Sequence, residues 1–249
     1  MAQPRSYLVV DVETVLDTAL PYPTVAADHL PAAPYHRVVS LGVCWFDADH
    51  KVIRFGIVGE GKPEEEMLAD FVRFFEGKRP VIVSWNGRSF DMPVIAARCF
   101  KHGIPFAHYY EERSLHYRYS TDGHFDLMDF LSDFGASHPA RLDTASRLIG
   151  LPGKMGVEGK DVGPLVHAGR VTEVQSYCLS DVIQIAALFL RTQMARGILD
   201  LTAYRVAMTE LFRQADQDAR IAHVMAAVDR PLVMLEHRAS PPSSASTPV

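Results

Sequence analysis

Short runs of β-favouring residues near the N-terminus constrain the fold of this chain most. Valine, isoleucine and aromatic residues dominate four such runs, at residues 6–13, 37–46, 51–58 and 80–85, and this composition is typical of β-strands. The turn Asp47-Ala48-Asp49-His50 separates the second run from the third, which predicts an antiparallel hairpin. Three early strands, a fourth after a helix and then mostly helices predict an α/β layered domain with a mixed sheet.

Helical patterns cover most of the remaining sequence. We predict helices at residues 63–76, 93–102, 126–134, 141–149, 171–196, 202–215 and 217–229. Prolines interrupt residues 14–36 and glycines interrupt residues 151–163, so both are predicted to be loops, whereas residues 104–125 show no clear pattern. We expect one domain over residues 1–235, with its motif-bearing core at about 5–195, and a disordered Ser/Pro/Ala tail over 236–249.

Composition and charge exclude several classes of protein. Of the 249 residues, 48% are apolar and 22% are charged, values that exclude wholesale disorder, collagen and coiled coil. The net charge of −5 argues against a histone-like protein but leaves a nucleic-acid enzyme open, because an acidic metal site can offset basic patches. Cys44, Cys99 and Cys178 form no CxxC pair and fit buried positions in a reducing compartment. Since no apolar stretch reaches about 18 residues, we expect a soluble cytoplasmic protein without a membrane segment.

Acidic side chains interrupt the sequence at two informative places in its first half. Asp11 ends the apolar run at residues 8–10, and Glu13 leaves the same face of the strand because side chains alternate. The alternative for this pair is a strand that simply reaches solvent. Asp91 stands two residues before Pro93, where helix capping is the first interpretation and catalysis the second.

Asp181 is the only charged residue between Val174 and Leu190, within an otherwise apolar helical segment. A carboxylate in such surroundings is costly unless it is paired or bound to a metal. Tyr177 lies four residues earlier, so its phenol stands beside Asp181 on one helix face. The alternative is a Tyr–Asp hydrogen bond of purely structural use.

Three short patterns follow one another along the chain: DxE at Asp11–Glu13, NxxxFD at Asn86–Asp91 and YxxxD at Tyr177–Asp181. In this order they resemble the motifs of the DnaQ-like 3′–5′ exonucleases of the DEDDy subtype, since the DEDDh subtype would have a histidine at the position of Ser176. The resemblance spans about residues 5–195. It is greatest to the predicted stand-alone exonucleases related to the proofreading exonuclease domain of family B DNA polymerases.

This resemblance implies a ribonuclease-H-like α/β fold, with a mixed five-stranded sheet flanked by helices. It also implies two divalent ions, Mg²⁺ or Mn²⁺. Asp11, Glu13 and Asp181 would hold one ion, and Asp11 would hold the other, with Asp91 acting through water. Tyr177 would orient the attacking water. The terminal nucleotide would be held and stacked by Asn86 and Phe90.

Elementary electrostatics gives an independent reason for metal ions. Two like charges about 4 Å apart repel by roughly 4 kcal/mol at an effective dielectric of 20, so four carboxylates in one pocket must partly protonate or bind cations. Sites built from oxygens select Mg²⁺ or Mn²⁺. Two such ions about 3.5–4 Å apart can hold both the attacking water and the leaving 3′-oxygen of a phosphodiester.

We therefore expect a metal-dependent 3′–5′ exonuclease that releases nucleoside monophosphates from single-stranded DNA or frayed 3′ ends, with a polymerase or repair partner in trans. An RNA 3′–5′ exonuclease is the alternative within the same chemistry. A non-catalytic nucleic-acid-binding scaffold is the alternative from another class. Five cations are weaker candidates for phosphate contacts, and for each one a solvated surface charge is the first interpretation: Arg88, Arg113, Arg118, Lys154 and Lys160. Asp126 and Asp129 are expected to act as caps or supporting groups rather than as metal ligands.

Overall fold

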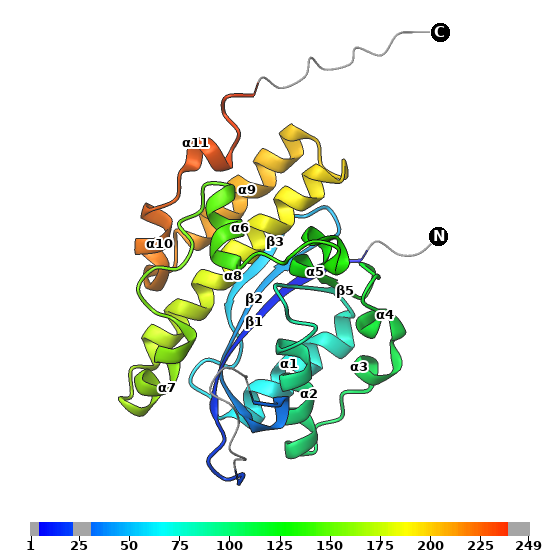
Figure 1. Cartoon of the computed structure of the whole chain (residues 1–249), viewed down its shortest axis with the longest axis vertical. Helices are drawn as coiled ribbons and strands as arrows, with labels where there is room; N and C mark the ends of the chain where they lie inside the picture. The colour runs from blue at the N-terminus through cyan, green and yellow to red at the C-terminus, as the bar shows by residue number, and fades with distance from the viewer. Residues whose placement is uncertain (1–4, 22–30, 239–249) are drawn as a thin grey trace.

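Five strands form one mixed sheet in the order β3-β2-β1-β4-β5 (Figure 1). The computed structural model describes residues 5–21 and 31–238 of the chain. The antiparallel part consists of β1 (Tyr7–Leu16), β2 (His36–Phe46) and β3 (Val52–Ile57). The parallel part continues from β1 through β4 (Val81–Ser84) to β5 (His124–Asp126). The strand β1 is therefore central, with neighbours on both sides.

Four of these strands confirm the sequence-based prediction, and the hairpin of β2 and β3 is antiparallel as expected. The first strand is longer than predicted, because it passes through a register shift between Glu13 and Thr14 and stays paired with β2 up to Leu16. The prediction missed β5. Only three residues long and paired with β4 alone, this strand is too short to show an alternating pattern.

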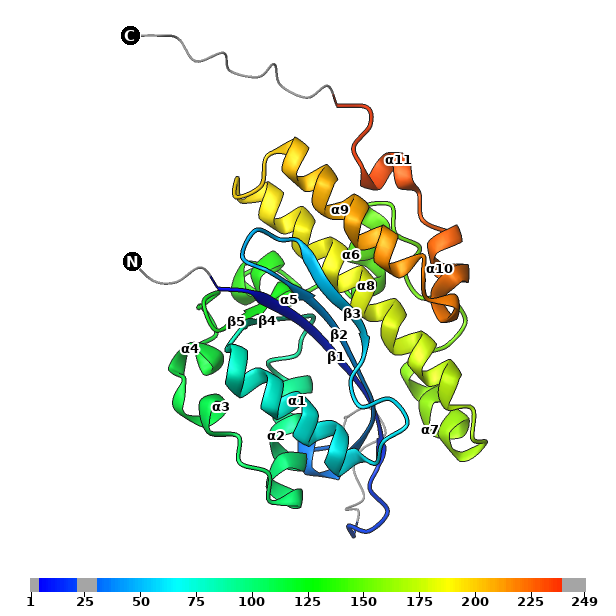
Figure 2. The same cartoon turned by 180° about the vertical axis from the view of Figure 1, so that it is seen from behind.

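Helices cover both faces of the sheet (Figures 1 and 2). One face is covered by α1 (Glu64–Lys78) and α2 (Asp91–His102), and the other by α6 (Leu142–Leu148), α8 (Val171–Ala195) and α9 (Leu201–Ala215). The alternation along β1 sends Leu8 and Val10 into the core under α1 and α2, and Val9 into the core under α8. Residues 11 and 13 continue the register of Val9, so their side chains leave toward α8.

The remaining elements lie in the connections. They are η1 (Ala33–Tyr35), α3 (Ala107–Glu111), α4 (Arg113–His116), α5 (Leu127–Leu131), η2 (Asp133–Gly135), α7 (Gly159–His167), η3 (Ala219–Ile221), α10 (Ala222–Ala226) and α11 (Arg230–Val233). The prediction of a loop over residues 151–163 is wrong for its last five residues, because α7 begins at Gly159. A reciprocal cap between Glu158 and Asp161 stabilises the start of this helix. Of the tail predicted to be disordered, residues 239–249 lie outside the described part of the chain.

The helix α8 is apolar on all sides because other elements pack around it, including β1, β2, α6 and α9. Gly42 of β2 makes its close approach possible. A Cβ atom at this position would lie 2.7 Å from Val182 Cγ2 and 2.8 Å from Cys178 Sγ. Because Gly42 is the register partner of Asp11, α8 comes nearest to the sheet beside that acid. Within the described residues, no helix has the length and hydropathy needed to cross a membrane.

A buried ion network fixes the far end of β1. Arg98 of α2 is 1% exposed, and its guanidinium donates to Asp17 just beyond β1 and to both carboxylate oxygens of Glu64 in α1. Lys101 also donates to Asp17, and Glu64 accepts from the backbone nitrogen of Val38 in β2. The network thus joins β1, β2, α1 and α2 close to the acidic strand.

Candidate active site

Two of the predicted acids leave the same face of β1. Glu13 is only 8% exposed, and Asp11 is partly buried. The Oδ2 atom of Asp11 is buried and accepts no hydrogen bond within the described residues. An unpaired buried carboxylate oxygen is costly, and a bound cation or a proton on the carboxyl group would lower that cost. The solvent-facing interpretation of this pair is therefore wrong.

Asp181 reaches the same place from α8. Each of Asp11, Glu13 and Asp181 offers a carboxylate oxygen, and these oxygens lie within 4.8 Å of one another. Asp181 is 7% exposed. The close packing of α8 at Gly42 brings Asp181 next to β1, although the two are far apart in the sequence.

Asp91 is held beside this group by the backbone of β1. Its Oδ1 accepts a hydrogen bond of 2.9 Å from the nitrogen of Val12, the residue between Asp11 and Glu13. The capping interpretation of Asp91 is wrong. The helix α2 begins at Asp91 itself, and Phe90 occupies the N-cap without a side-chain cap. Asp91 does not belong to the close group of three acids.

Burial and mutual repulsion shift the pKa values of these acids. Burial raises the pKa of Asp11 well above its ordinary value, and the charges of Asp181 and Glu13 raise it further. The pKa of Glu13 rises for the same reasons, burial first and then Asp181 and Asp91. Burial raises the pKa values of Asp91 and Asp181 to about 7 each. The metal-free centre therefore holds protons near neutral pH that a divalent cation would replace.

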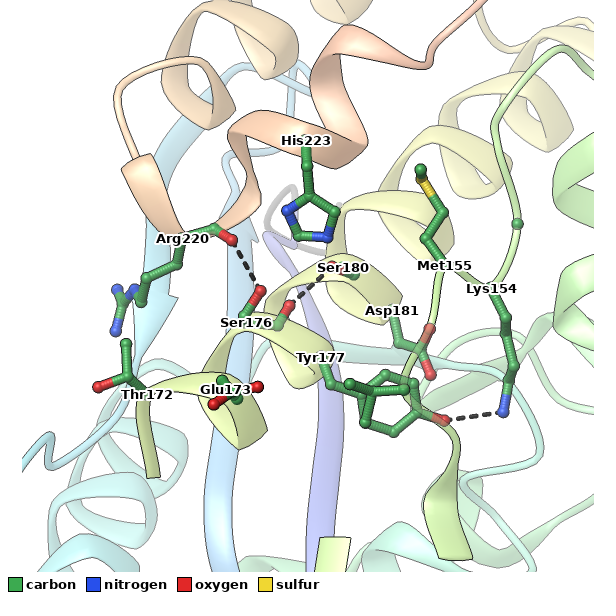
Figure 3. Close-up of a pocket in the computed structure, with 12 residues that line it drawn as sticks. Lys154, Met155, Thr172, Glu173, Ser176, Tyr177, Ser180, Asp181, Arg220 and His223 are labelled. Atoms are coloured by element: carbon green, nitrogen blue, oxygen red, sulfur yellow. Dashed lines mark hydrogen bonds between the residues drawn. The ribbon is translucent and has the colours of Figure 1, made fainter. Parts of the chain in front are cut away.

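Tyr177 and Lys154 form the wall next to Asp181. The Nζ of Lys154 donates to the phenol oxygen of Tyr177 over 2.7 Å and lies 5.3 Å from the centre of its ring (Figure 3). Burial raises the pKa of Tyr177, and the charge of Asp181 raises it further, so the phenol stays protonated at neutral pH. The charge of Lys154 offsets part of the rise in the pKa values of Glu13 and Asp181, because this cation lies near both acids.

An open cleft of about 840 Å³ runs past the acids. Asp11, Asp181, Lys154 and Asn86 line it, together with residues 139–143. Asn86 follows β4 in a left-handed conformation (φ 63°), and its backbone nitrogen donates to Asp126. The structure therefore brings Asn86 to the acids. Phe90 is half-buried against His36 instead, with ring centroids 4.9 Å apart, and is not among the residues that line the cleft.

The supporting groups differ in part from the sequence-based interpretation. Asp126 caps α5 and accepts from the nitrogens of Asn86 and Arg88, which confirms its structural role. The Arg88 guanidinium is turned inward to the carbonyls of Leu115 and His124, which leaves it poorly placed for a phosphate. Arg118 is paired with Asp129 and Lys160 with Glu158. Sequence reasoning gave Lys154 too little weight and missed Arg141, an exposed cation in the cleft.

The donor set of this centre fits a divalent cation that prefers oxygen ligands. The three close donors are carboxylates, and one of their oxygens is buried without a hydrogen-bond partner. Among the residues that the structure describes, no nitrogen or sulfur donor belongs to the group. Such a set is typical of Mg²⁺ or Mn²⁺.

The fold is of the ribonuclease-H-like α/β class, and the acidic centre lies between β1 and α8. Residues 27–227 match the family of predicted 3′–5′ exonucleases related to the exonuclease domain of PolB, and the chain belongs to this family of enzymes. The match includes Asp91, Tyr177 and Asp181. Asp11 and Glu13 precede it, and their assignment depends on the geometry described above.

Similar solved structures include larger enzymes. The family B DNA polymerase from the hyperthermophilic archaeon Pyrobaculum calidifontis is 19% identical, with a TM-score of 0.53 over 85% of this chain and 29% of the polymerase. E. coli exonuclease I in complex with a 5cy-dT13 oligonucleotide is 14% identical, with a TM-score of 0.40 over 81% of this chain and 42% of that enzyme. The chain thus spans less than half of either protein. No curated protein matches it.

Proposed function

We propose that this protein removes nucleotides one at a time from the 3′ end of single-stranded or frayed DNA, by a two-metal mechanism of the DEDDy type. The observation that carries the proposal is the convergence of Asp11, Glu13 and Asp181 within 4.8 Å, with one buried oxygen left unpaired. Asp11, Glu13 and Asp181 would hold one Mg²⁺ or Mn²⁺. Asp11 would share the second ion with Asp91, which acts through water.

The reaction is hydrolysis of the last phosphodiester. A water oxygen forms a bond to phosphorus as the bond to the 3′-oxygen of the preceding nucleotide breaks, giving a nucleoside 5′-monophosphate and a shortened strand with a free 3′-hydroxyl. The bound ions would supply charge for the attacking and leaving oxygens. Tyr177, kept neutral by its raised pKa, would orient the attacking water, while Lys154 fixes the direction of the phenol.

The substrate end would lie in the open cleft. Asn86, on the loop that Asp126 anchors, faces the same cleft as Asp11 and Asp181 and is proposed to hold the terminal nucleotide. Phe90 would stack on that nucleotide only after its ring leaves His36. Arg141 and Lys154 would meet phosphates.

A cleavage assay tests this function directly. Purified protein is incubated with 5′-labelled single-stranded DNA, or with RNA of the same sequence, in Mg²⁺, Mn²⁺ or EDTA. We expect shortening of the DNA in both metals, none in EDTA, and loss of activity in Asp11→Asn. Faster loss of RNA would favour the RNA exonuclease. Binding without cleavage in either metal would contradict the proposal and favour the non-catalytic scaffold.

A further inference from the structure

A second hollow borders the open cleft at Lys154 and Asp181. It is a cavity of about 310 Å³ between α8, the loop at residues 153–157 and the segment that carries η3 and α10. Lys154 and Asp181 line both the cavity and the cleft, whereas His223 lines the cavity alone. Figure 3 shows Tyr177 and Asp181 on the Lys154 side of α8, and the imidazole of His223 over Ser176 and Ser180.

Hydrogen bonds hold the segment just before His223 against α8. The hydroxyl of Ser176 in α8 donates to the carbonyl of Arg220 over 2.7 Å. The Arg220 guanidinium in turn donates to Asp218 and to the side-chain oxygen of Gln175 in α8. The η3 turn is therefore bound to α8, and His223 lies in α10, which begins directly after η3.

The cavity carries one unmatched donor for an anion, the ring of His223, and one further positive charge, that of Lys154. His223 is exposed, and no hydrogen bond or ion pair of its ring occurs within the described residues. A histidine ring has at least one N–H donor whatever its charge. Lys154 adds a positive charge at the border with the acids. Of the acids in the wall, Glu173 is already paired with Arg170, and Asp181 belongs to the proposed metal centre.

The opposite wall is apolar. It is made of the side chains of Met155 and Val157 and the ring of Tyr177, and Met155 is 39% exposed. A cavity with anion donors on one side and an exposed thioether and a ring on the other matches a nucleotide, which has a phosphate and a flat, largely apolar base.

We propose that this cavity is a subsite for the nucleotide on the 5′ side of the scissile bond, in which the His223 imidazole contacts its phosphate. The inference rests on the proposed function, since it assigns the terminal nucleotide to Asn86 in the cleft. A phosphodiester at the acids has one nucleotide on each side, and the two hollows meet at Asp181 and Lys154. The C-terminal segment, which follows the three motifs in sequence, thereby becomes part of the substrate site.

Binding without turnover tests the subsite. The dissociation constants of dTMP and of 5′-phosphorylated dT2 and dT3 are measured by calorimetry in Ca²⁺ for the wild type, His223→Ala and His223→Asn. The 5′-phosphate of dT2 supplies the phosphate that His223 is proposed to contact. We expect His223→Ala to weaken dT2 and dT3 about 5- to 20-fold and to leave dTMP unchanged, because only the longer ligands reach the cavity. His223→Asn, which keeps an N–H donor, should recover part of this loss. Met155→Glu should weaken dT2 and dT3 by placing a negative charge in the opposite wall.

A matched control is His167→Ala, which removes another exposed histidine, from α7 outside the cavity, and should change nothing. Equal losses for dTMP and dT3 in His223→Ala would place the terminal nucleotide in the cavity and overturn the assignment. No loss for any ligand would remove the subsite. Mn²⁺-dependent cleavage by the wild type is measured in parallel. If the wild type cleaves and the dissociation constants of His223→Ala equal those of the wild type, the subsite alone is refuted. If the wild type binds these ligands but cleaves none of them, the proposed function is refuted.

Discussion

At the scale of single residues, the acids of the centre are a stability cost to the metal-free protein. A carboxyl group whose pKa is raised on folding binds more protons in the folded state than in the unfolded state. For Asp91 and Asp181, with pKa values of about 7, this difference extends from about pH 4 to about pH 7. The contribution of these groups to the free energy of unfolding therefore falls as the pH rises through this window.

Asp181→Asn should consequently stabilise the metal-free protein at pH 8. The amide keeps the shape of the carboxyl group and removes its repulsion with Asp11 and Glu13. We expect a higher melting temperature than that of the wild type in EDTA, by about 2–4 °C per kcal/mol gained, and little difference at pH 4.5. Glu66→Gln, on the exposed face of α1, is the control. A lower melting temperature of Asp181→Asn at pH 8 would show that repulsion is not the dominant effect.

Mn²⁺ should reverse the order of the melting temperatures of the wild type and Asp181→Asn, so that the wild type becomes the more stable protein. At one hundred times its dissociation constant, a ligand that binds only the folded state adds about 2.7 kcal/mol to the free energy of unfolding. The wild type should gain this amount. At one fixed Mn²⁺ concentration the gain should be larger at pH 8 than at pH 6, because the carboxyl groups must release protons to bind the ion. Asp11→Asn and Asp181→Asn should lose most of the gain. A wild-type melting temperature that does not change across a Mn²⁺ titration would rule out the centre as a metal site.

Tyr177→Phe separates the phenol from the acids. The substitution keeps the buried ring and removes only the hydroxyl that Lys154 contacts. Positioned proton-transfer groups contribute about 10²–10⁴-fold to a rate. The single-turnover cleavage rate should therefore fall by a factor in this range or by a smaller one, while Mn²⁺ still stabilises the fold. Asp181→Ala should lower the rate further, because it also removes a ligand. A wild-type rate in Tyr177→Phe would leave the phenol as a structural neighbour of Asp181.

At the scale of elements, the sequence predicted what periodicity and composition control. The alternation along β1 correctly placed Asp11 and Glu13 on one face, and the apolar sequence around Asp181 correctly marked a buried carboxylate. It did not show how α8 reaches β1, because that depends on the missing side chain of Gly42 in another strand. The helix-capping interpretation of Asp91 failed for a similar reason, since its hydrogen-bond partner, the nitrogen of Val12, is distant in sequence.

Arg98→Met tests how far the buried ion network supports the acidic strand. Hydrogen bonds from Lys101 and Arg98 hold the pKa of Asp17 below its ordinary value. A lowered carboxyl pKa stabilises the fold above the unfolded pKa and loses this effect as the pH falls. Removing Arg98 leaves Asp17 and Glu64 poorly compensated, so we expect a loss of about 3–5 kcal/mol at pH 7 and a smaller loss near pH 4.

Arg73→Met provides the comparison, because the Arg73–Asp70 pair is exposed and should contribute no more than about 1 kcal/mol. Denaturant unfolding of the three proteins at both pH values measures the differences. Equal losses for Arg98→Met and Arg73→Met would mean that the network adds little to the position of β1.

At the scale of the whole molecule, the three motifs predicted the fold and the family, whereas the segments that connect the main helices and strands could not be predicted from the sequence. Three patterns and their order gave the five-stranded fold and the family, because each pattern lies on an element whose place the fold determines. Residues 104–125 gave nothing, since α3, α4 and β5 there are each only three to five residues long. The position of His223 was equally hidden: it depends on a return of the chain to α8 that no local pattern encodes.

Under the proposed function, the arrangement of the cleft would determine where a strand is cut. Asn86 and the acids line one cleft, so a free 3′ end held by Asn86 would place the last phosphodiester at Asp11 and Asp181. A 5′-labelled linear strand should therefore shorten by one nucleotide at a time, and a circular single strand of the same sequence should stay intact. A strand that ends in a 3′-phosphate should be degraded more slowly than one with a 3′-hydroxyl, because the added negative charge would lie near the carboxylates. These products are resolved on a denaturing gel. Cutting of the circle would identify an endonuclease and would remove Asn86 and Phe90 from the roles proposed for them.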